Sequence, residues 1–330
     1  MNFIYKCISC FLVSYLLLMR GCTTSLPNEY EVYSWPKAVM EIDSLVEKDE
    51  NIFFISKDGL SKYDKIKEIY TVIIKSSTIN SFQLSNDSIY YCEKENTIYK
   101  MDFNGENIVK IVELNQVSPL LIEKSLENFA IWGDNIYIKS SGISFIRYSM
   151  VEKQAENFID DIAQYTFFEN SLYFIDHINK SFSLYRKNLD TLSVELLRGD
   201  GISKRNNYSE NVDIYARYDN IIAANKHLFY TTRNPAKLFQ FSESGEDILI
   251  EEFKSVEGAE YLTITANENK IYYVLESGEL KDYLFEYDIE TGEKEQKIML
   301  QNANYAFGIK VIDGYVFYRS NNNCIHFLCL

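Results

Sequence analysis

The chain has 330 residues, 15% of them aromatic, and its 48 acidic and 33 basic residues give a net charge of −15. A surface with this excess of negative charge repels nucleic acid and anionic lipid head groups, so we expect no nucleic-acid partner. With only 13 Gly and 4 Pro, the composition permits many strand ladders and disfavours flexible linkers and phosphate-binding glycine loops.

The chain begins with a pattern that is typical of an export signal. Lys6 precedes a short apolar run from Cys7 to Met19. As a helix this run spans only about 20 Å, which is less than the ~30 Å hydrocarbon core of a bilayer. A basic start followed by a short apolar run predicts a signal peptide over residues 1–21 rather than a stable membrane span.

The next residue, Cys22, follows Gly21 directly. This arrangement resembles a bacterial lipoprotein signal, in which the cysteine after a small residue is lipidated and becomes the mature N-terminus. The resemblance covers residues 1–22 and departs from the usual pattern at Met19 and Arg20. It implies lipidation of Cys22, a polar tether over residues 22–29 and a place on the extracytoplasmic face of the cell membrane. The alternative is a plain signal peptide, cleaved nearby, with Cys22 unmodified.

The rest of the chain is organised by a repeated phrase: a turn residue, an aliphatic residue, then two mostly aromatic residues. The phrase occurs seven times, with its aliphatic residue at positions 52, 89, 136, 172, 228, 271 and 316, which are 37, 47, 36, 56, 43 and 45 residues apart. A period in the forties built from strand-forming residues is the signature of a β-propeller. We therefore predict an all-β, seven-bladed propeller over residues 30–330, with four antiparallel strands per blade. Six blades is the alternative, if the weak repeat around residues 51–64 is not a full blade.

Each phrase predicts the second strand of its blade, with a strand before it and others after it. The predicted inner strands include residues 81–84, 165–168, 261–264 and 307–311. The predicted third strands include residues 97–101, 183–186, 237–241, 283–288 and 324–328, and outer strands are expected at 108–112 and 248–250. The last repeat stops after its third strand, and Tyr30–Tyr33 has the alternation needed to supply the fourth. We expect this N-terminal strand to close the ring, since closure removes an open sheet edge.

The clearest repeat combines Ile98-Tyr99-Lys100-Met101-Asp102 with Asn104-Gly105. Over residues 38–330 this pattern resembles a family of bacterial propellers of unknown function, which are similar to the propellers of low-density lipoprotein receptors and, more loosely, to the TolB propeller. The shared pattern is structural. It implies blades and no particular catalytic residue or cofactor.

Residues suited to catalysis or metal binding are few and scattered. The three histidines, His177, His227 and His326, lack metal-ligand spacing, so we expect strand or loop residues and no metal site. The adjacent pair Asp160-Asp161 is expected in a solvated turn, because neighbouring residues on a strand point to opposite faces. Cys92, Cys324 and Cys329 are expected to be buried thiols without a disulfide.

One long polar connection, residues 199–213, explains much of the largest repeat spacing. Connections between an outer strand and the next inner strand line one rim of a propeller, where long loops often bind ligands. Within it Lys204, Arg205 and Tyr208 are the candidate contact residues. The tripeptide Arg198-Gly199-Asp200 also occurs in adhesion ligands, although a chance match in a turn explains it equally well.

The sequence therefore predicts a non-catalytic binding module at the cell envelope. Its partner would be an envelope protein, peptide or glycan, and the propeller would be a monomer held to the membrane by its lipid anchor. The competing hypothesis is an enzyme that acts on glycans, as a lyase or hydrolase, at the mouth of the channel. A purely structural envelope component is a third option.

Overall fold

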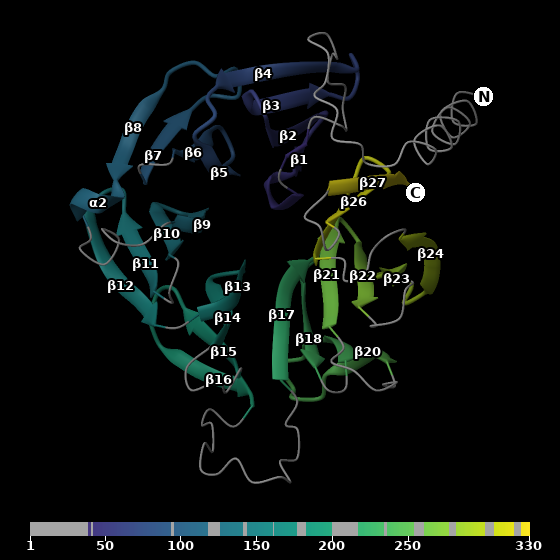
Figure 1. The fold of residues 1–330 in the computed structure, drawn as a ribbon. Helices are drawn as coiled ribbons and strands as arrows, with labels where there is room; N and C mark the ends of the chain where they lie inside the picture. The colour runs from purple at the N-terminus through teal and green to yellow at the C-terminus, as the bar shows by residue number, and fades with distance from the viewer. Residues whose placement is uncertain are drawn as a thin grey trace, which may run out of the picture.

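The computed structural model describes residues 39–40, 42–93, 96–117, 126–140, 144–160, 162–176, 183–199, 217–233, 236–253, 261–276, 282–300, 307–319 and 325–330. These residues form seven separate antiparallel sheets, arranged as blades around a central axis (Figure 1). The predicted seven-bladed propeller is confirmed. The six-bladed alternative is wrong, because the weak first repeat forms a complete four-stranded sheet.

The strands follow the ring in chain order. Blade 1 contains β1 (Val46–Lys48), β2 (Asn51–Ser56), β3 (Gly59–Asp64) and β4 (Ile69–Lys75). Blade 2 contains β5 (Ile79–Leu84), β6 (Ile89–Glu93), β7 (Thr97–Met101) and β8 (Val109–Glu113). Blade 3 contains β9 (Leu126–Trp132), β10 (Asn135–Ser140), β11 (Ser144–Ser149) and β12 (Gln154–Asp160). Blade 4 contains β13 (Ile162–Phe168), β14 (Ser171–Asp176), β15 (Leu184–Asn188) and β16 (Val194–Arg198).

Blade 5 contains β17 (Arg217–Ala224), β18 (His227–Arg233), β19 (Ala236–Gln240) and β20 (Ile248–Phe253). Blade 6 contains β21 (Tyr261–Asn267), β22 (Lys270–Glu276), β23 (Asp282–Asp288) and β24 (Lys294–Leu300). Blade 7 has three strands among the described residues: β25 (Phe307–Ile312), β26 (Tyr315–Arg319) and β27 (Ile325–Cys329). Two short helices complete the described elements, the 3₁₀ helix η1 (Ile42–Ser44) and the α-helix α2 (Leu114–Val117).

The repeated phrase forms the second strand of every blade, as predicted. In blade 1, Ile52 and Phe54 pack into the cluster shared with blade 7, while Phe53 and Ile55 pack into the cluster shared with blade 2. Successive side chains of a strand point to opposite faces, and each face of a blade is covered by a neighbouring blade. A strand buried on both faces needs consecutive apolar residues. This explains why the phrase is a continuous apolar run.

The hydrophobic core is correspondingly divided among the blade interfaces. Within the described residues, each of the seven buried clusters draws its side chains from two neighbouring blades. The cluster between blades 7 and 1 combines Ile312 and Phe317 with Ile52 and Phe54, so packing joins the last blade to the first.

A second regular feature twists each blade. In all six four-stranded blades, the pairing of the third strand with the outer strand shifts register at one point, for example between Leu184 and Tyr185 in blade 4. A bulge of this kind bends its strand and increases the local twist. The repeated register shift therefore increases the twist of the outer strand relative to the rest of its blade.

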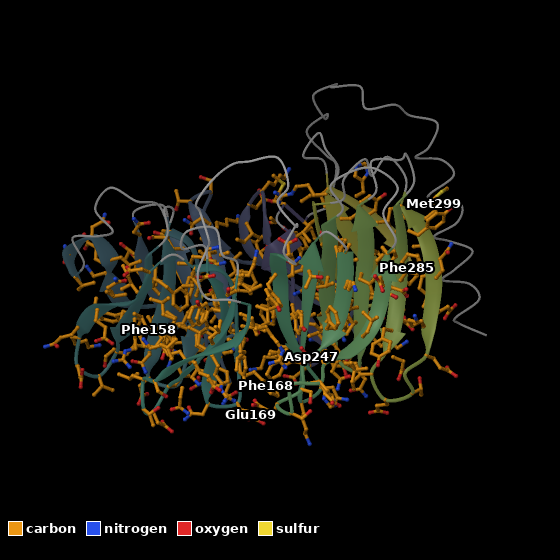
Figure 2. All side chains as sticks on the ribbon, turned by 90° about the horizontal axis from the view of Figure 1, so that it is seen from below. Phe158, Phe168, Glu169, Asp247, Phe285 and Met299 are labelled. Carbon is orange, nitrogen blue, oxygen red and sulfur yellow. The ribbon has the colours of Figure 1, made fainter. Side chains whose placement is uncertain are left out.

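The ring has two distinct faces. The turn face carries the hairpin turns that join first to second strands and third to fourth strands. Figure 2 shows the ring edge-on, with Glu169 of the β13–β14 turn at its lower edge. The connection face is the opposite one, where each outer strand ends and the first strand of the next blade begins. On the turn face polar residues cap the turns, as when the Asp102 carboxylate accepts the backbone N–H groups of Asn104 and Glu106.

Other sequence predictions have mixed outcomes. Cys92 is a buried free thiol, as expected, whereas Cys329 is only half-buried. Cys22, Cys324 and the predicted closing strand Tyr30–Tyr33 lie outside the described residues. None of the described helices has the length and apolar character needed to cross a membrane.

Candidate functional site

The predicted contact residues Lys204, Arg205 and Tyr208 lie outside the described residues, but both ends of their connection are described. Outer strand β16 ends at Arg198, and inner strand β17 of the next blade begins at Arg217. The connection therefore starts at the end of blade 4 and leads into the first strand of blade 5, as the sequence predicts.

An ion pair holds the start of this connection. The Arg198 guanidinium donates from Nε to Asp247 Oδ2 at 2.7 Å and from Nη2 to Asp247 Oδ1 at 2.6 Å. Its carbon Cζ also lies 4.7 Å from the centre of the Phe241 ring. Since Asp247 and Phe241 belong to blade 5, this two-pronged contact joins the last residue of blade 4 to its neighbour. Arg198 is thus engaged internally, which argues against the adhesion interpretation of Arg198-Gly199-Asp200.

Asp247 is labelled in Figure 2, and its side chain is only 8% exposed. Its carboxylate also accepts the Tyr230 hydroxyl at 2.6 Å and the Ser242 backbone N–H at 2.8 Å. Burial by itself would raise the pKa of Asp247, but the hydrogen bonds from Arg198, Tyr230 and Ser242 outweigh it and lower the pKa. The carboxylate therefore stays charged at neutral pH and keeps the anchor intact.

A set of β-bulges lies where the inner strands begin. In blades 2, 3, 4, 5 and 7, the pairing between the first and second strands shifts register within the first few residues of the inner strand. Inner strands start at the connection face, so these bulges surround the mouth of the channel on that face. Bulges are frequent at rims and beside binding sites because they redirect a side chain.

Backbone groups at two of these bulges, in blades 4 and 5, are hydrogen-bonded to side chains. The Lys139 ammonium of blade 3 donates to the Ala163 carbonyl in the blade 4 bulge at 2.8 Å. In blade 5 the Asn220 backbone N–H donates to Thr231 Oγ1 at 3.1 Å, and its side-chain amide donates to the Leu262 carbonyl of blade 6 at 2.8 Å. Satisfied polar groups of this kind hold a local distortion in one conformation.

Exposed amide side chains stand at this end of the inner strands. Asn80, Asn128 and Gln164 are exposed residues of β5, β9 and β13. These three strands are the innermost of their blades (Figure 1), so the exposed amides stand near the axis of the ring, at the connection-face ends of the strands. The Tyr165 hydroxyl donates to Asn128 Oδ1 at 2.9 Å, and burial raises the pKa of Tyr165. The mouth therefore offers neutral donors and acceptors. The sequence analysis missed these residues, whose only signal is a polar amide early in β5, β9 and β13.

The described residues that were considered for acid–base or metal chemistry make hydrogen bonds and ring contacts within the strands. His227 begins β18 and its Nδ1 lies 3.0 Å from the Gln240 amide, whereas His326 is the second residue of β27 and stacks on Tyr318. Asp160 is exposed and accepts the Asn157 amide at 2.6 Å. In the described ranges no three His, Cys, Asp or Glu residues are grouped so that they could hold a metal ion. His177 and Asp161 are outside those ranges.

No protein-family model and no curated protein sequence matches the chain. Among solved structures it is similar to YCF48 bound to D1 peptide, with a TM-score of 0.53 and 10% identity over 88% of this chain and 92% of that one. It is also similar to the extracellular domain of the BT4673 system from B. thetaiotaomicron, with a TM-score of 0.54 and 12% identity over 88% of this chain and 39% of that one.

A puromycin-hydrolyzing peptidase from Mycobacterium tuberculosis gives a TM-score of 0.56 and 9% identity over 83% of this chain and 50% of that one. The chain thus spans half or less of the length of the BT4673 domain and of the peptidase. At identities this low, the likeness establishes a shared propeller fold, while function has to be inferred from the site.

Proposed function

We propose that the chain is a lipid-anchored, extracytoplasmic β-propeller that binds a partner at the cell envelope without catalysing a reaction. The observation that carries this proposal is the set of exposed amides, Asn80, Asn128 and Gln164, at the connection-face mouth of the channel. Fixed bulges position these neutral groups, and the long connection anchored at Arg198 starts on the same face. A rigid scaffold that presents polar groups and a long loop together is a common plan for a binding surface.

The chemistry of the mouth favours a partner that is rich in hydrogen-bonding groups. A side-chain amide both donates and accepts, which suits the backbone of an extended peptide or the hydroxyl groups of a glycan. The partner would therefore be an envelope protein, a peptide or a glycan. The propeller of YCF48, which is bound to a D1 peptide, provides a precedent for the peptide option within this fold. Lys204, Arg205 and Tyr208 remain the proposed contacts on the long connection.

The location is proposed from the N-terminal pattern. After cleavage of residues 1–21, Cys22 would carry the lipid and residues 22–29 would tether a monomeric propeller to the membrane. Mass spectrometry of the mature N-terminus tests this step directly. A diacylglyceryl group on Cys22 supports anchoring, and an unmodified N-terminus near residue 22 would instead indicate a plain signal peptide.

Binding can be tested with the mature chain carrying a C-terminal affinity tag. Three variants would be compared with the wild type for partner capture from envelope extract: Asn128→Ala with Gln164→Ala, Lys204→Ala with Arg205→Ala, and the turn-face control Glu268→Ala with Asn269→Ala. We expect a partner that the wild type and the control retain equally and that a connection-face variant loses by at least about tenfold. Equal capture by all variants would reject the connection face as the site. Conversion of an envelope glycan by the purified chain would favour the competing enzyme hypothesis.

A further inference from the structure

One exposed amide at the channel mouth is held in a single orientation. The Tyr165 hydroxyl of blade 4 donates to Asn128 Oδ1 of blade 3 at 2.9 Å. A hydroxyl that donates selects the carbonyl end of the amide, so the Nδ2 amino group at the other end faces away from Tyr165. Among the described residues this amino group has no hydrogen-bond partner, and Asn128 is exposed. Asn128 therefore presents two N–H donors to the solvent.

The tyrosine that orients this amide is fixed by packing. Its ring centre lies 4.6 Å from that of Phe145 and 6.0 Å from that of Phe167, the latter at an angle of 82°. Ile162 and Tyr165 pack on the same cluster between blades 3 and 4 although they are three residues apart, which the bulge at Ala163 makes possible. Burial raises the pKa of Tyr165, so its hydroxyl stays protonated and able to donate.

The corresponding asparagine of blade 5 is used in the opposite way. Asn128 and Asn220 both lie at the bulge of their inner strand, directly before a buried apolar residue, Phe129 or Ile221. Asn220 donates its side-chain amino group to the Leu262 carbonyl of the next blade at 2.8 Å. The next blade thus offers an acceptor to Asn220 and a donor to Asn128. Of the two asparagines, Asn128 is the one whose amino group remains available to a ligand.

A fixed donor discriminates best against groups that cannot accept, and it matches groups that only accept. The hydroxyl groups of a glycan both donate and accept, and they adapt by rotation, whereas a carbonyl oxygen only accepts. Gln164 is also exposed, directly precedes Tyr165, and makes no side-chain hydrogen bond within the described ranges. Its amide can therefore turn to accept as well as donate. An acceptor for Asn128 and a donor for Gln164 are the two polar groups of a peptide backbone.

We propose that Tyr165 is a positioning residue that makes this corner of the mouth a site for the backbone of an extended polypeptide. Asn128 Nδ2 donates to a carbonyl oxygen of the partner, and Gln164 Oε1 accepts one of its N–H groups. The inference rests on the proposed function and narrows its partner to a protein or peptide. Figure 1 shows β9 and β13, which carry the two amides, as the innermost strands of neighbouring blades.

The orientation of the amide can be tested without any partner. In NMR spectra of the mature chain labelled with ¹⁵N-asparagine, Tyr165→Phe should lower the order parameter of the Asn128 side-chain amide, because its only hydrogen bond among the described residues is lost. The Asn220 amide in the same spectra is the internal control and should be unchanged. An equally ordered Asn128 amide in Tyr165→Phe would overturn the positioning role. A strong nuclear Overhauser effect between the Asn128 amino protons and the Tyr165 ring in the wild type would overturn the orientation.

Recognition can be tested with two probes, an immobilised library of random hexapeptides with capped ends and a glycan array. We expect the wild type to retain peptides and Asn128→Asp to lose at least about tenfold, because an acceptor of the same shape replaces the donor. Tyr165→Phe should lose about threefold, since its Asn128 amide is free to rotate. The control Asn80→Asp makes the same change of charge at an exposed amide of blade 2 and should bind as the wild type does.

The outcomes separate this inference from the proposed function. Full retention of peptides by Asn128→Asp, or binding to the glycan array alone, would overturn the peptide assignment. If the wild type captured a partner from envelope extract but bound no peptide, the peptide assignment would fail and the proposed function would stand. If it bound neither probe and captured no partner, both would be rejected.

Discussion

The imidazole of His326 stacks on the ring of Tyr318, with centroids 5.2 Å apart and planes inclined by 20°. The same register position holds a stacked aromatic pair in four other blades: Tyr91–Tyr99, Phe174–Tyr185, Tyr230–Phe239 and Tyr273–Phe285, with centroids 5.2–5.3 Å apart. In blade 7, histidine therefore takes the place of a packing aromatic. Burial lowers the pKa of His326, in keeping with a structural imidazole.

Replacing this imidazole by a phenyl ring should stabilise the protein. We expect His326→Phe to raise the free energy of unfolding by about 1 kcal/mol at pH 7, through burial of a larger apolar ring in the stack. Because the folded pKa is below the unfolded value of 6.5, the unfolded wild type takes up a proton first as the pH falls. The wild type should thus lose stability below about pH 6.5 relative to the variant. Urea unfolding at several pH values measures both effects. A stability difference between His326→Phe and the wild type that stays constant from pH 7 to pH 5 would contradict the predicted pH dependence.

The anchor between blades 4 and 5 should contribute strongly to stability. Asp247→Asn leaves the half-buried Arg198 guanidinium without its counter-charge, and we expect a loss of about 3 kcal/mol at pH 7. Since the pKa of Asp247 is lowered, the wild type holds this stabilisation above about pH 4 and loses it as the pH falls further. The difference in unfolding free energy between the wild type and Asp247→Asn should therefore become smaller in acid. Denaturant titrations at pH 7 and pH 3 measure it.

The matched control for this prediction is an exposed ion pair. Glu195 lies 2.6 Å from Arg186 and its side chain is 58% exposed. Glu195→Gln should therefore cost less than about 1 kcal/mol. If both variants lost the same stability, burial would not be what gives the Asp247 anchor its strength.

Alanine substitutions at two glycines distinguish the cost of backbone strain from the cost of a steric clash between blades. Gly105 has φ +82°, and a Cβ there would lie 2.6 Å from Ile73 Cγ2 and 2.9 Å from the Ile73 carbonyl oxygen of the neighbouring blade. Gly245 has φ +89° and no atom within 4 Å of such a Cβ. Gly245→Ala should cost about 1 kcal/mol from strain alone, and Gly105→Ala about 1–3 kcal/mol more, because blades 1 and 2 must separate locally. Thermal unfolding of the two variants gives the comparison, and equal losses would show that this contact adjusts without cost.

The buried thiol of Cys92 should resist alkylation in the folded protein. Burial, with a smaller effect from Glu93, raises the pKa of Cys92 to about 12. Thiolate is the reactive form, so very little is present at pH 8. We expect iodoacetamide to modify the half-buried Cys329 at least about tenfold faster than Cys92, as followed by mass spectrometry of peptides. Rapid labelling of Cys92 in the native chain would show that blade 2 opens readily.

The repeated phrase predicted the second strands because their burial on both faces imposes a local pattern of consecutive apolar residues. The inner strands at 81–84 and 307–311 were placed correctly within β5 and β25 for the same reason. The bulges were not predicted. A bulge such as the one at Ala163 is an offset between two paired strands, and no residue type marks it. The amides Asn128 and Gln164 were therefore missed, and Lys204, Arg205 and Tyr208 stay predictions.

By itself, the sequence predicted the propeller, with seven blades or six, and the order of its strands, since each strand carries its own apolar pattern and turn residues. Only the tertiary structure decided which distant residues meet. Arg198 and Asp247 are 49 positions apart, and their contact exists because the core between blades 4 and 5 holds β16 against the β19–β20 turn. The channel mouth likewise forms only when inner strands from separate repeats converge around one axis, which no single repeat can encode.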